Sequence, residues 1–362
     1  MDRKTQADEA VPSPLEHLNF QINLIDDWLT SPAVFSGGAI AGCIDNAGLA
    51  LYTYPEISGY YLSYIAYRVN TDGITEQLAD KAKKILEYQK KIWSQSTPPA
   101  TRLYVNADVN GQADWRNQGL FIFDIAMLVR GITDIARFVD SHSWAQQVLS
   151  PYIHSFWEFE QLSPVRWFAG RPAAAPDRWS TRVGVYQLKV LAALQRAAVA
   201  WSDAVLQENI ASVQSELIQG FNKGDFATHN PHSIAYAMEG AMLLGESCID
   251  WGMADNWLQS FAVTTDANAQ RDIDYRRADV IAQLLRLSCC EPFFNASRAN
   301  RLYCLLNSVL NKDGSFQFSL APSNVTYKNT WTALFARQAL DFYRGICITG
   351  KPIRVKVARC LF

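Results

Sequence analysis

Apolar residues recur along most of this chain three or four positions apart, the spacing of a single helix face. Alternation of apolar and polar positions, the pattern of a half-buried strand, is rare and short. We therefore expect an all-α protein. The spacing predicts twelve helices, over residues 15–30, 58–70, 73–96, 118–139, 142–160, 180–200, 203–220, 231–247, 253–263, 275–290, 296–311 and 328–345.

The predicted helices form pairs that recur about every 50 to 60 residues, with longer loops on alternate connections, such as 36–56 and 96–115. This arrangement is typical of an (α/α)6 toroid, in which inner helices surround an axial cavity and outer helices cover them. An open solenoid requires a shared repeat consensus, which these pairs lack. We expect a single toroid domain over 15–345, an N-terminal arm over 1–14 and a tail over 346–362 that packs on the toroid as an extended strand.

Composition and charge narrow the class of protein. With 362 residues, 49% of them hydrophobic and 19% charged, the chain can bury a large core. Its 33 basic and 35 acidic residues give a net charge of −2, so nothing in the overall charge favours nucleic acid or an anionic membrane. The start lacks the apolar stretch of a signal peptide, and no run approaches the ~20 apolar residues of a membrane span. We expect a soluble, cytoplasmic protein whose seven cysteines are reduced thiols; composition predicts no oligomeric state.

A carboxylate lies among tyrosines in TYPEISGYY (53–61). Pro55 suits the first position of a helix, and Glu56 suits its first turn, where a negative charge offsets the helix dipole. If Glu56 instead faces a cavity, then Tyr54 and Tyr60 give it the surroundings of a general acid or base with a raised pKa. The sequence leaves both roles open.

A second candidate segment joins a polar loop to an apolar helix. Asp114 suits an N-cap, Trp115 offers a flat face for stacking on a sugar, and Arg116 offers a forked donor for a carboxylate or for hydroxyls. Asp124 interrupts the apolar run FIFDIAMLV, where an unpaired buried charge is costly. It therefore either pairs with an arginine in the core or faces a polar cavity.

A third segment, HNPHSIAYAMEG (229–240), carries a row of side chains suited to proton transfer. His232, Tyr236 and Glu239 lie four and three residues apart, so they share one helix face. A histidine that hydrogen-bonds locally at a helix start also fits the position of His232. His229 and His232 lack the spacing and third ligand of a zinc motif, so we predict no metal and no cofactor.

The remaining polar candidates have equally plausible structural roles. Arg182 and Tyr186, four residues apart, suit either an anionic sugar or a salt-bridged surface helix. Trp331 follows a polar loop, an arrangement that suits carbohydrate contact. Arg277 and Asp279 precede an apolar helix, and we interpret them as part of a solvated charge cluster.

Three segments carry a family resemblance. TYPEISGYYLSYIAYR (53–68), GLFIFDIAMLVRGI (119–132) and HSIAYAMEGAMLLG (232–245) resemble, in that order, motifs of (α/α)6-toroid proteins found with bacterial polysaccharide-assembly genes. That group is distantly similar to the catalytic domain of glucuronyl C5-epimerases and to the six-hairpin glycosidase-like superfamily. The segments at 180–194 and 327–340 look like two further motifs of the group. Ser180 and Thr181 stand where the group has an aromatic residue and a histidine, so no role of that histidine transfers.

The resemblance implies a carbohydrate-active enzyme that acts on a saccharide or polysaccharide in an axial cleft by acid/base chemistry, within bacterial surface-polysaccharide metabolism. It leaves glycoside hydrolase, lyase and uronyl epimerase open. Two alternatives remain: a terpenoid-type cyclase on a related toroid, and a non-catalytic glycan-binding or scaffold subunit. The catalytic candidates are Glu56, Asp124 and His232, and the substrate-binding candidates are Tyr54, Tyr60, Trp115, Arg116, Arg182, Tyr186, Tyr236, Glu239 and Trp331.

Overall fold

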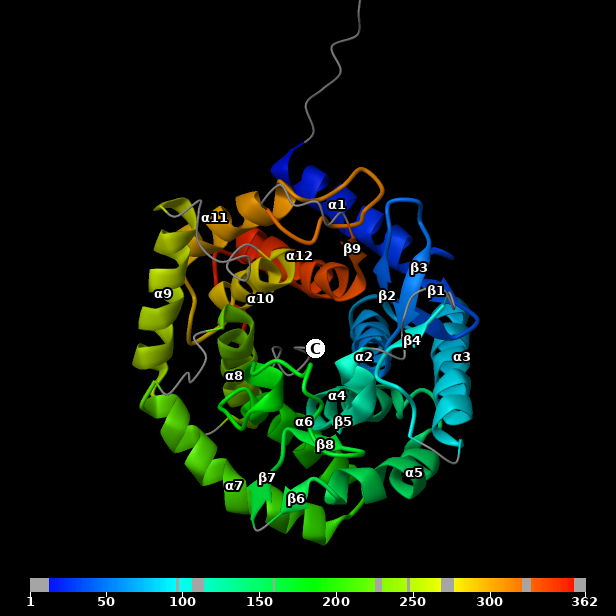
Figure 1. Ribbon diagram of the computed structural model, residues 1–362. Helices are drawn as coiled ribbons and strands as arrows, with labels where there is room; N and C mark the ends of the chain where they lie inside the picture. The colour runs from blue at the N-terminus through cyan, green and yellow to red at the C-terminus, as the bar shows by residue number, and fades with distance from the viewer. Residues whose placement is uncertain are drawn as a thin grey trace, which may run out of the picture.

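The computed structural model describes residues 13–95, 98–105, 114–158, 160–224, 230–245, 248–267, 277–320 and 327–354. This part of the chain contains twelve α-helices, which alternate between an inner and an outer ring (Figure 1). The inner helices are α2 (Pro55–Asp72), α4 (Ile122–Ile135), α6 (Gln187–Ala200), α8 (Pro231–Leu244), α10 (Ala278–Ser288) and α12 (Thr330–Thr349). The outer helices are α1 (Pro14–Thr30), α3 (Glu76–Trp93), α5 (His142–His154), α7 (Ala204–Asn222), α9 (Trp251–Ala267) and α11 (Ala296–Asn307).

The inner helices form a closed ring. Each contacts the next, and α12 contacts α2, so that the ring has no open end. The outer helices pack on the inner ones, as Figure 1 shows in projection down the axis. The prediction of an (α/α)6 toroid is therefore confirmed. None of the helices in the described ranges combines the length and hydropathy that crossing a bilayer requires.

Short strands replace several segments that the sequence pattern assigned to loops or helices. The apolar run AIAGCI, predicted as loop, is β2 (Ala39–Ile44), the centre of a five-stranded antiparallel sheet. The helix predicted over 118–139 is shorter at both ends, since its start pairs as β5 and its last residues form a turn. The helix predicted over 142–160 is shorter at its end, where residues 157–158 pair as β6. The other strands are β1 (Phe35–Ser36), β3 (Ala50–Thr53), β4 (Leu103–Tyr104), β9 (Lys328–Asn329), β5 (Gly119–Phe121) with β8 (Val165–Trp167), and β6 (Trp157–Glu158) with β7 (Gln161–Leu162).

The end of the chain departs from its predicted boundary. Helix α12 continues to Thr349, beyond the predicted end at 345, and stops where Gly350 takes a left-handed conformation (φ 65°). Ile353 then forms a parallel bridge with Cys290. The rest of the expected extended tail, residues 355–362, lies outside the described residues.

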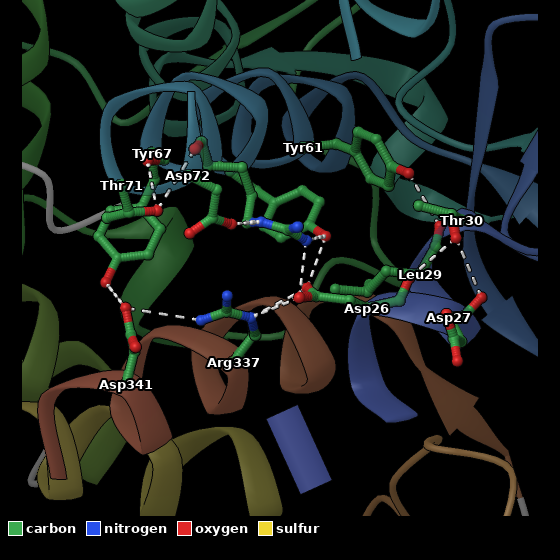
Figure 2. Close-up of polar contacts among 12 residues, drawn as sticks. Asp26, Asp27, Leu29, Thr30, Tyr61, Tyr67, Thr71, Asp72, Arg337 and Asp341 are labelled. Atoms are coloured by element: carbon green, nitrogen blue, oxygen red, sulfur yellow. Dashed lines mark hydrogen bonds and ion pairs between the residues drawn. The ribbon is translucent and has the colours of Figure 1, made fainter. Parts of the chain in front are cut away.

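A polar network joins the first and last helices where the ring closes (Figure 2). Asp26 of α1 accepts hydrogen bonds from Arg337 Nε of α12, at 2.9 and 3.0 Å, and from Tyr64 Oη of α2, at 2.7 Å. Arg68 of α2 lies 2.6 Å from the same carboxylate, and Arg337 also reaches Asp341, at 3.6 Å. The Asp26 carboxylate thus joins α1 and α2, at the start of the chain, to α12 at its end.

Glycine permits the close approach of α2 and α4. A Cβ at Gly59 would lie 2.2 Å from the carbonyl oxygen of Met127, and one at Gly131 would lie 2.1 Å from that of Gly59. Because both neighbours are backbone atoms, no side-chain rotation relieves the clash.

We expect Gly59→Ala to lower the free energy of unfolding by about 1–3 kcal/mol through overpacking. Urea denaturation measures this loss. Gly220→Ala in α7 is the matched control, because its new Cβ meets only Val185 Cγ1, at 3.4 Å. This control should be neutral or slightly stabilising. Equal stability of the two variants would contradict the close approach.

Candidate functional site

A cavity of about 550 Å³ opens at the N-terminal ends of the inner helices. Its lining includes Glu56, Asp124, His232 and Trp331, which belong to the first turns of α2, α4, α8 and α12. The N-terminus of a helix carries a partial positive charge, so this end of the toroid favours negative groups.

Local sequence explains how these residues reach the cavity. Pro55 begins α2 and places Glu56 in its first turn, as predicted. Asn230 caps α8 by accepting a hydrogen bond from the backbone N–H of His232, at 3.0 Å. Asn329 likewise caps α12 through the N–H of Thr332, at 3.1 Å. Each cap fixes the start of its helix, where the second residue after the cap, His232 or Trp331, lines the cavity.

The cavity contains two buried carboxyl groups. Tyr54 Oη donates a hydrogen bond to Asp124 Oδ1, at 3.1 Å, whereas Asp124 Oδ2 has no hydrogen-bond partner among the described residues. Burial and the neighbouring charge of Asp124 raise the pKa of Glu56 to about 8. Burial raises the pKa of Asp124 to about 7, against the effects of Tyr54 and Arg102. The two groups therefore exchange protons near neutral pH, as an acid and a base require.

Aromatic rings form much of the wall. Trp331 packs against Tyr54, with ring centroids 6.3 Å apart, and donates a hydrogen bond from Nε1 to Asp279, at 3.1 Å. On another side, Trp179 packs 5.8 Å from the His232 ring and 5.9 Å from the Tyr236 ring. Such faces suit the apolar faces of a sugar ring.

Four arginines also line the cavity, namely Arg102, Arg116, Arg178 and Arg277. Asp114, the N-cap predicted from the sequence, lies 3.2 Å from Arg102 Nη1 and 3.0 Å from Arg116 Nη1. These contacts hold the two guanidinium groups in place at the rim.

Arg277 pairs with the fully buried Asp279, Nε to Oδ1 at 3.0 Å. The prediction of a solvated charge cluster here was wrong, since Arg277 is only 9% exposed. The inner ring buries both side chains at the start of α10, a tertiary effect that the local sequence does not contain.

His232 lies between the cavity and the core. Its Nδ1 is 2.7 Å from Gln283 Oε1, and its ring packs 4.2 Å from that of Tyr236. Burial and the charge of Arg277 lower the pKa of His232 to about 3, although Asp279 and Gln283 act in the opposite direction. The imidazole is therefore neutral at physiological pH.

The structure brings eight of the twelve candidate residues together. The cavity lining contains Tyr54, Glu56, Trp115, Arg116, Asp124, His232, Tyr236 and Trp331.

The other four candidates are not among the described lining residues. Arg182 forms a surface ion pair with Asp177, so the salt bridge of the structural alternative is present, although Arg182 lies before α6 and not in a helix. Tyr186 is buried and donates its Oη hydrogen bond to the Arg182 carbonyl, at 3.2 Å. Tyr60 is buried in the core, and Glu239 is fully buried in an ion-pair network. Tyr60 and Glu239 do lie on helices, but helical spacing does not tell which face meets the cavity. For Arg182 and Tyr186 the expected helix was wrong, because α6 begins only at Gln187 and Arg182 is in extended backbone.

Sequence reasoning missed several lining residues, among them Tyr52, Arg102, Tyr104, Arg178 and Trp179. Trp179 directly precedes the motif segment at 180–194, and this position could have marked it as a candidate. Arg102 and Tyr104 reach the cavity only because β4 pairs with β3, and no local pattern marks them. His229 and Arg276 lie outside the described residues. Within the described residues, no three His, Cys, Asp or Glu side chains converge as a metal site.

No protein-family model and no curated protein matches the sequence. Solved structures do match the fold. A D-mannose isomerase aligns with a TM-score of 0.62 at 12% identity, covering 93% of this chain and 99% of that one. The cellobiose 2-epimerase from Spirochaeta thermophila DSM 6192 gives 0.63 at 12%, with 94% and 100% covered.

An unsaturated glucuronyl hydrolase specific for heparin gives a TM-score of 0.58 at 12% identity, with 93% and 99% covered. At this identity the likeness concerns the fold. The chain is a single-domain (α/α)6 toroid similar in structure to enzymes of the six-hairpin glycosidase-like kind.

Proposed function

We propose that this protein is a carbohydrate-active enzyme that binds an acidic saccharide in the cavity and acts on it with Glu56 and Asp124 as acid and base. One observation carries the proposal: two carboxyl groups with raised pKa values line a cavity with aromatic walls. Isolated structural carboxylates at helix starts have no need of such surroundings, because exposure or a paired arginine keeps them ionised at lower cost.

Size and lining support a saccharide. A volume of about 550 Å³ falls within the ~300–1,000 Å³ of small-molecule sites. Trp115, Trp179 and Trp331 offer faces for stacking, while Tyr54 and Asn329 offer hydrogen-bonding groups for hydroxyls. The structural neighbours named as isomerase, epimerase and hydrolase of sugars agree with this substrate class.

The arginines favour a negatively charged saccharide. Asp114 and Asp279 balance part of the charge of the four lining arginines, and the raised pKa values keep one proton on the Glu56 and Asp124 pair near neutral pH. Arginine binds carboxylate or sulfate through paired hydrogen bonds. The converging helix N-termini add to the attraction. The same charges make the cavity unsuited to the hydrocarbon substrate of a terpenoid-type cyclase.

The two carboxyl groups take complementary roles. Glu56 acts as the acid and Asp124 as the base, because Tyr54 donates a hydrogen bond to Asp124 Oδ1 and so favours the ionised form of that carboxyl group. Tyr54 holds Asp124 in place through its hydrogen bond. Such a pair serves hydrolysis, in which the base removes a proton from water and the acid protonates the leaving oxygen. In elimination and epimerisation the base removes the proton of the carbon next to a carboxylate. Elimination then expels the leaving group with a proton from the acid, whereas epimerisation returns a proton from the acid to the other face of that carbon.

The test is incubation of the protein with a panel of acidic and neutral glycans in D2O, followed by NMR and mass spectrometry. New reducing ends identify a hydrolase, ultraviolet-absorbing unsaturated ends identify a lyase, and deuterium in an intact chain identifies an epimerase. We expect one of these changes with an acidic glycan, at a rate about 10²- to 10⁴-fold lower after Glu56→Gln. Binding without turnover would indicate a glycan-binding subunit and contradict the proposal of an enzyme. Turnover of neutral glycans alone would contradict the acidic substrate.

A further inference from the structure

A row of buried polar side chains runs from the core to the cavity through His232. Glu239 Oε2 accepts hydrogen bonds from Lys189 Nζ, at 2.6 Å, and from Gln283 Nε2, at 3.3 Å. Its other oxygen pairs with Arg286. Gln283 Oε1 then lies 2.7 Å from His232 Nδ1. Glu239 and Gln283 are fully buried, and we call these two residues the relay.

The ionised state of Glu239 decides the orientation of the Gln283 amide. Burial opposes ionisation, but the charges and hydrogen bonds of Arg286 and Lys189 hold the pKa of Glu239 below its usual value. An ionised carboxylate only accepts hydrogen bonds, so the group facing it must be the Gln283 NH2. A flipped amide would place two acceptor oxygens 3.3 Å apart. The Gln283 carbonyl oxygen therefore faces His232.

The amide orientation in turn decides the protonation of the imidazole. Because Gln283 Oε1 is an acceptor, His232 Nδ1 must carry the hydrogen. Arg277, Asp279 and Lys189 are the charged groups around the ring, and together with burial they leave it neutral. Its Nε2 consequently holds a lone pair. Among the described residues nothing hydrogen-bonds to Nε2, and the ring lines the cavity.

We propose that the relay of Glu239 and Gln283 fixes His232 as the Nδ1–H tautomer, so that Nε2 accepts a hydrogen bond from a hydroxyl group of the bound ligand. Gln283 is thus a positioning residue that acts through His232. The tautomer follows from the relay alone. Its use for a ligand hydroxyl rests on the proposed function. The proposal also gives Glu239, which does not touch the cavity, a role in the site.

The tautomer is measured on the whole protein without any ligand. Protein labelled with 15N-histidine is recorded by long-range 1H–15N NMR, and His232→Gln identifies the signals of His232. We expect a protonated Nδ1 and a lone-pair Nε2, distinguished by their couplings to the two ring carbon-bound protons. An Nε2–H tautomer or a doubly protonated ring at pH 7 in the wild type overturns the proposal, whatever any variant does.

Gln283→Leu removes the acceptor and should shift the ring toward the Nε2–H tautomer. Gln187→Leu is the matched control, because Gln187 is a buried glutamine that donates to the Leu162 carbonyl, at 2.8 Å, away from His232. That variant should keep the Nδ1–H tautomer. An unchanged tautomer in a folded Gln283→Leu protein would refute the relay.

The proposed hydrogen bond between His232 Nε2 and a ligand hydroxyl is tested by a separate measurement, the binding affinity. With a glycan identified in the D2O panel, Gln283→Leu should weaken binding by up to about tenfold, because the Nε2–H form no longer accepts the hydroxyl hydrogen, and the ligand hydroxyl in the cavity is then left without its acceptor. Gln187→Leu should leave the affinity unchanged. If no glycan of the panel binds, the proposed function is refuted but the tautomer proposal stands. If Gln283→Leu alters the tautomer without altering the affinity, the contact between Nε2 and a ligand hydroxyl is refuted but the proposed function stands.

Discussion

Replacing Glu56 with glutamine, or Asp124 with asparagine, should lower kcat by about 10²- to 10⁴-fold, the usual contribution of one general acid or base. Each change keeps the shape of the side chain but removes its titration. Both groups act in the same catalysed reaction, so losing the second costs little once the first is lost. The double variant should therefore be little slower than either single variant. Steady-state kinetics on the glycan identified in the D2O experiment measures both effects.

The pH dependence of kcat/KM in the wild type tests which of the two carboxyl groups is the acid and which is the base. Activity requires an ionised Asp124 and a protonated Glu56. It should therefore fall as the pH drops below about 7, where Asp124 gains its proton, and as it rises above about 8, where Glu56 loses its own. Glu56→Gln should abolish the alkaline limb in its residual activity. A profile that is flat between pH 5 and 10 would rule out the pair.

The pH dependence of the free energy of unfolding tests the ionisation of Glu56 without an activity assay. A carboxyl group whose pKa is raised in the folded state is favoured there in its neutral form. It contributes stability that is fully present below the unfolded pKa and is lost as the pH rises through the folded pKa. Glu56→Gln has no such charge, so it should lose less stability than the wild type between pH 6 and 9. Urea unfolding at the two pH values gives the comparison, and a less stable variant at pH 9 would mean that Glu56 is ionised and paired.

Replacing Glu239 with leucine should lower the free energy of unfolding by about 3–5 kcal/mol, the usual result of removing one partner of a buried ion pair. Lys189 and Arg286 are both fully buried, and Glu239 is the carboxylate between them. Without it, Arg286 has no counter-charge in the core, and Lys189, whose pKa burial already lowers to about 7, gives up its proton. Urea denaturation measures the loss.

The surface pair supplies the control for this second prediction. Asp177 and Arg182 form an ion pair with side chains 50% and 46% exposed. Asp177→Leu should therefore change stability by only about 0–1 kcal/mol. Adding Lys189→Met to Glu239→Leu should recover part of the loss, because the buried amine that has lost its acceptor disappears. A Glu239→Leu protein as stable as the wild type would show that the network does not depend on its anion.

The sequence predicted most of the architecture, because helix periodicity is a local property. All twelve helices occur near their predicted positions, and the alternation of long and short connections indicated the closed ring. The starts of α2 and α8 were also predictable, since Pro55 and Pro231 mark first turns. Short strands such as β2 were missed, because a six-residue apolar run pairs only when a partner is brought beside it.

The site divides in the same way. Glu56, Asp124 and His232 were found from the sequence because a polar residue at the apolar start of a helix stands out against its neighbours. Which face of each helix meets the cavity was decided by the ring. Tyr236 and Glu239 lie three residues apart on α8, yet only Tyr236 lines the cavity. Arg102, just before β4, and Arg277, just before α10, come from segments distant in sequence. The sequence determines the local structure of each segment and the side chains that it carries. Burial, charge pairing and pKa values depend on contacts between segments, so only the tertiary structure decides them.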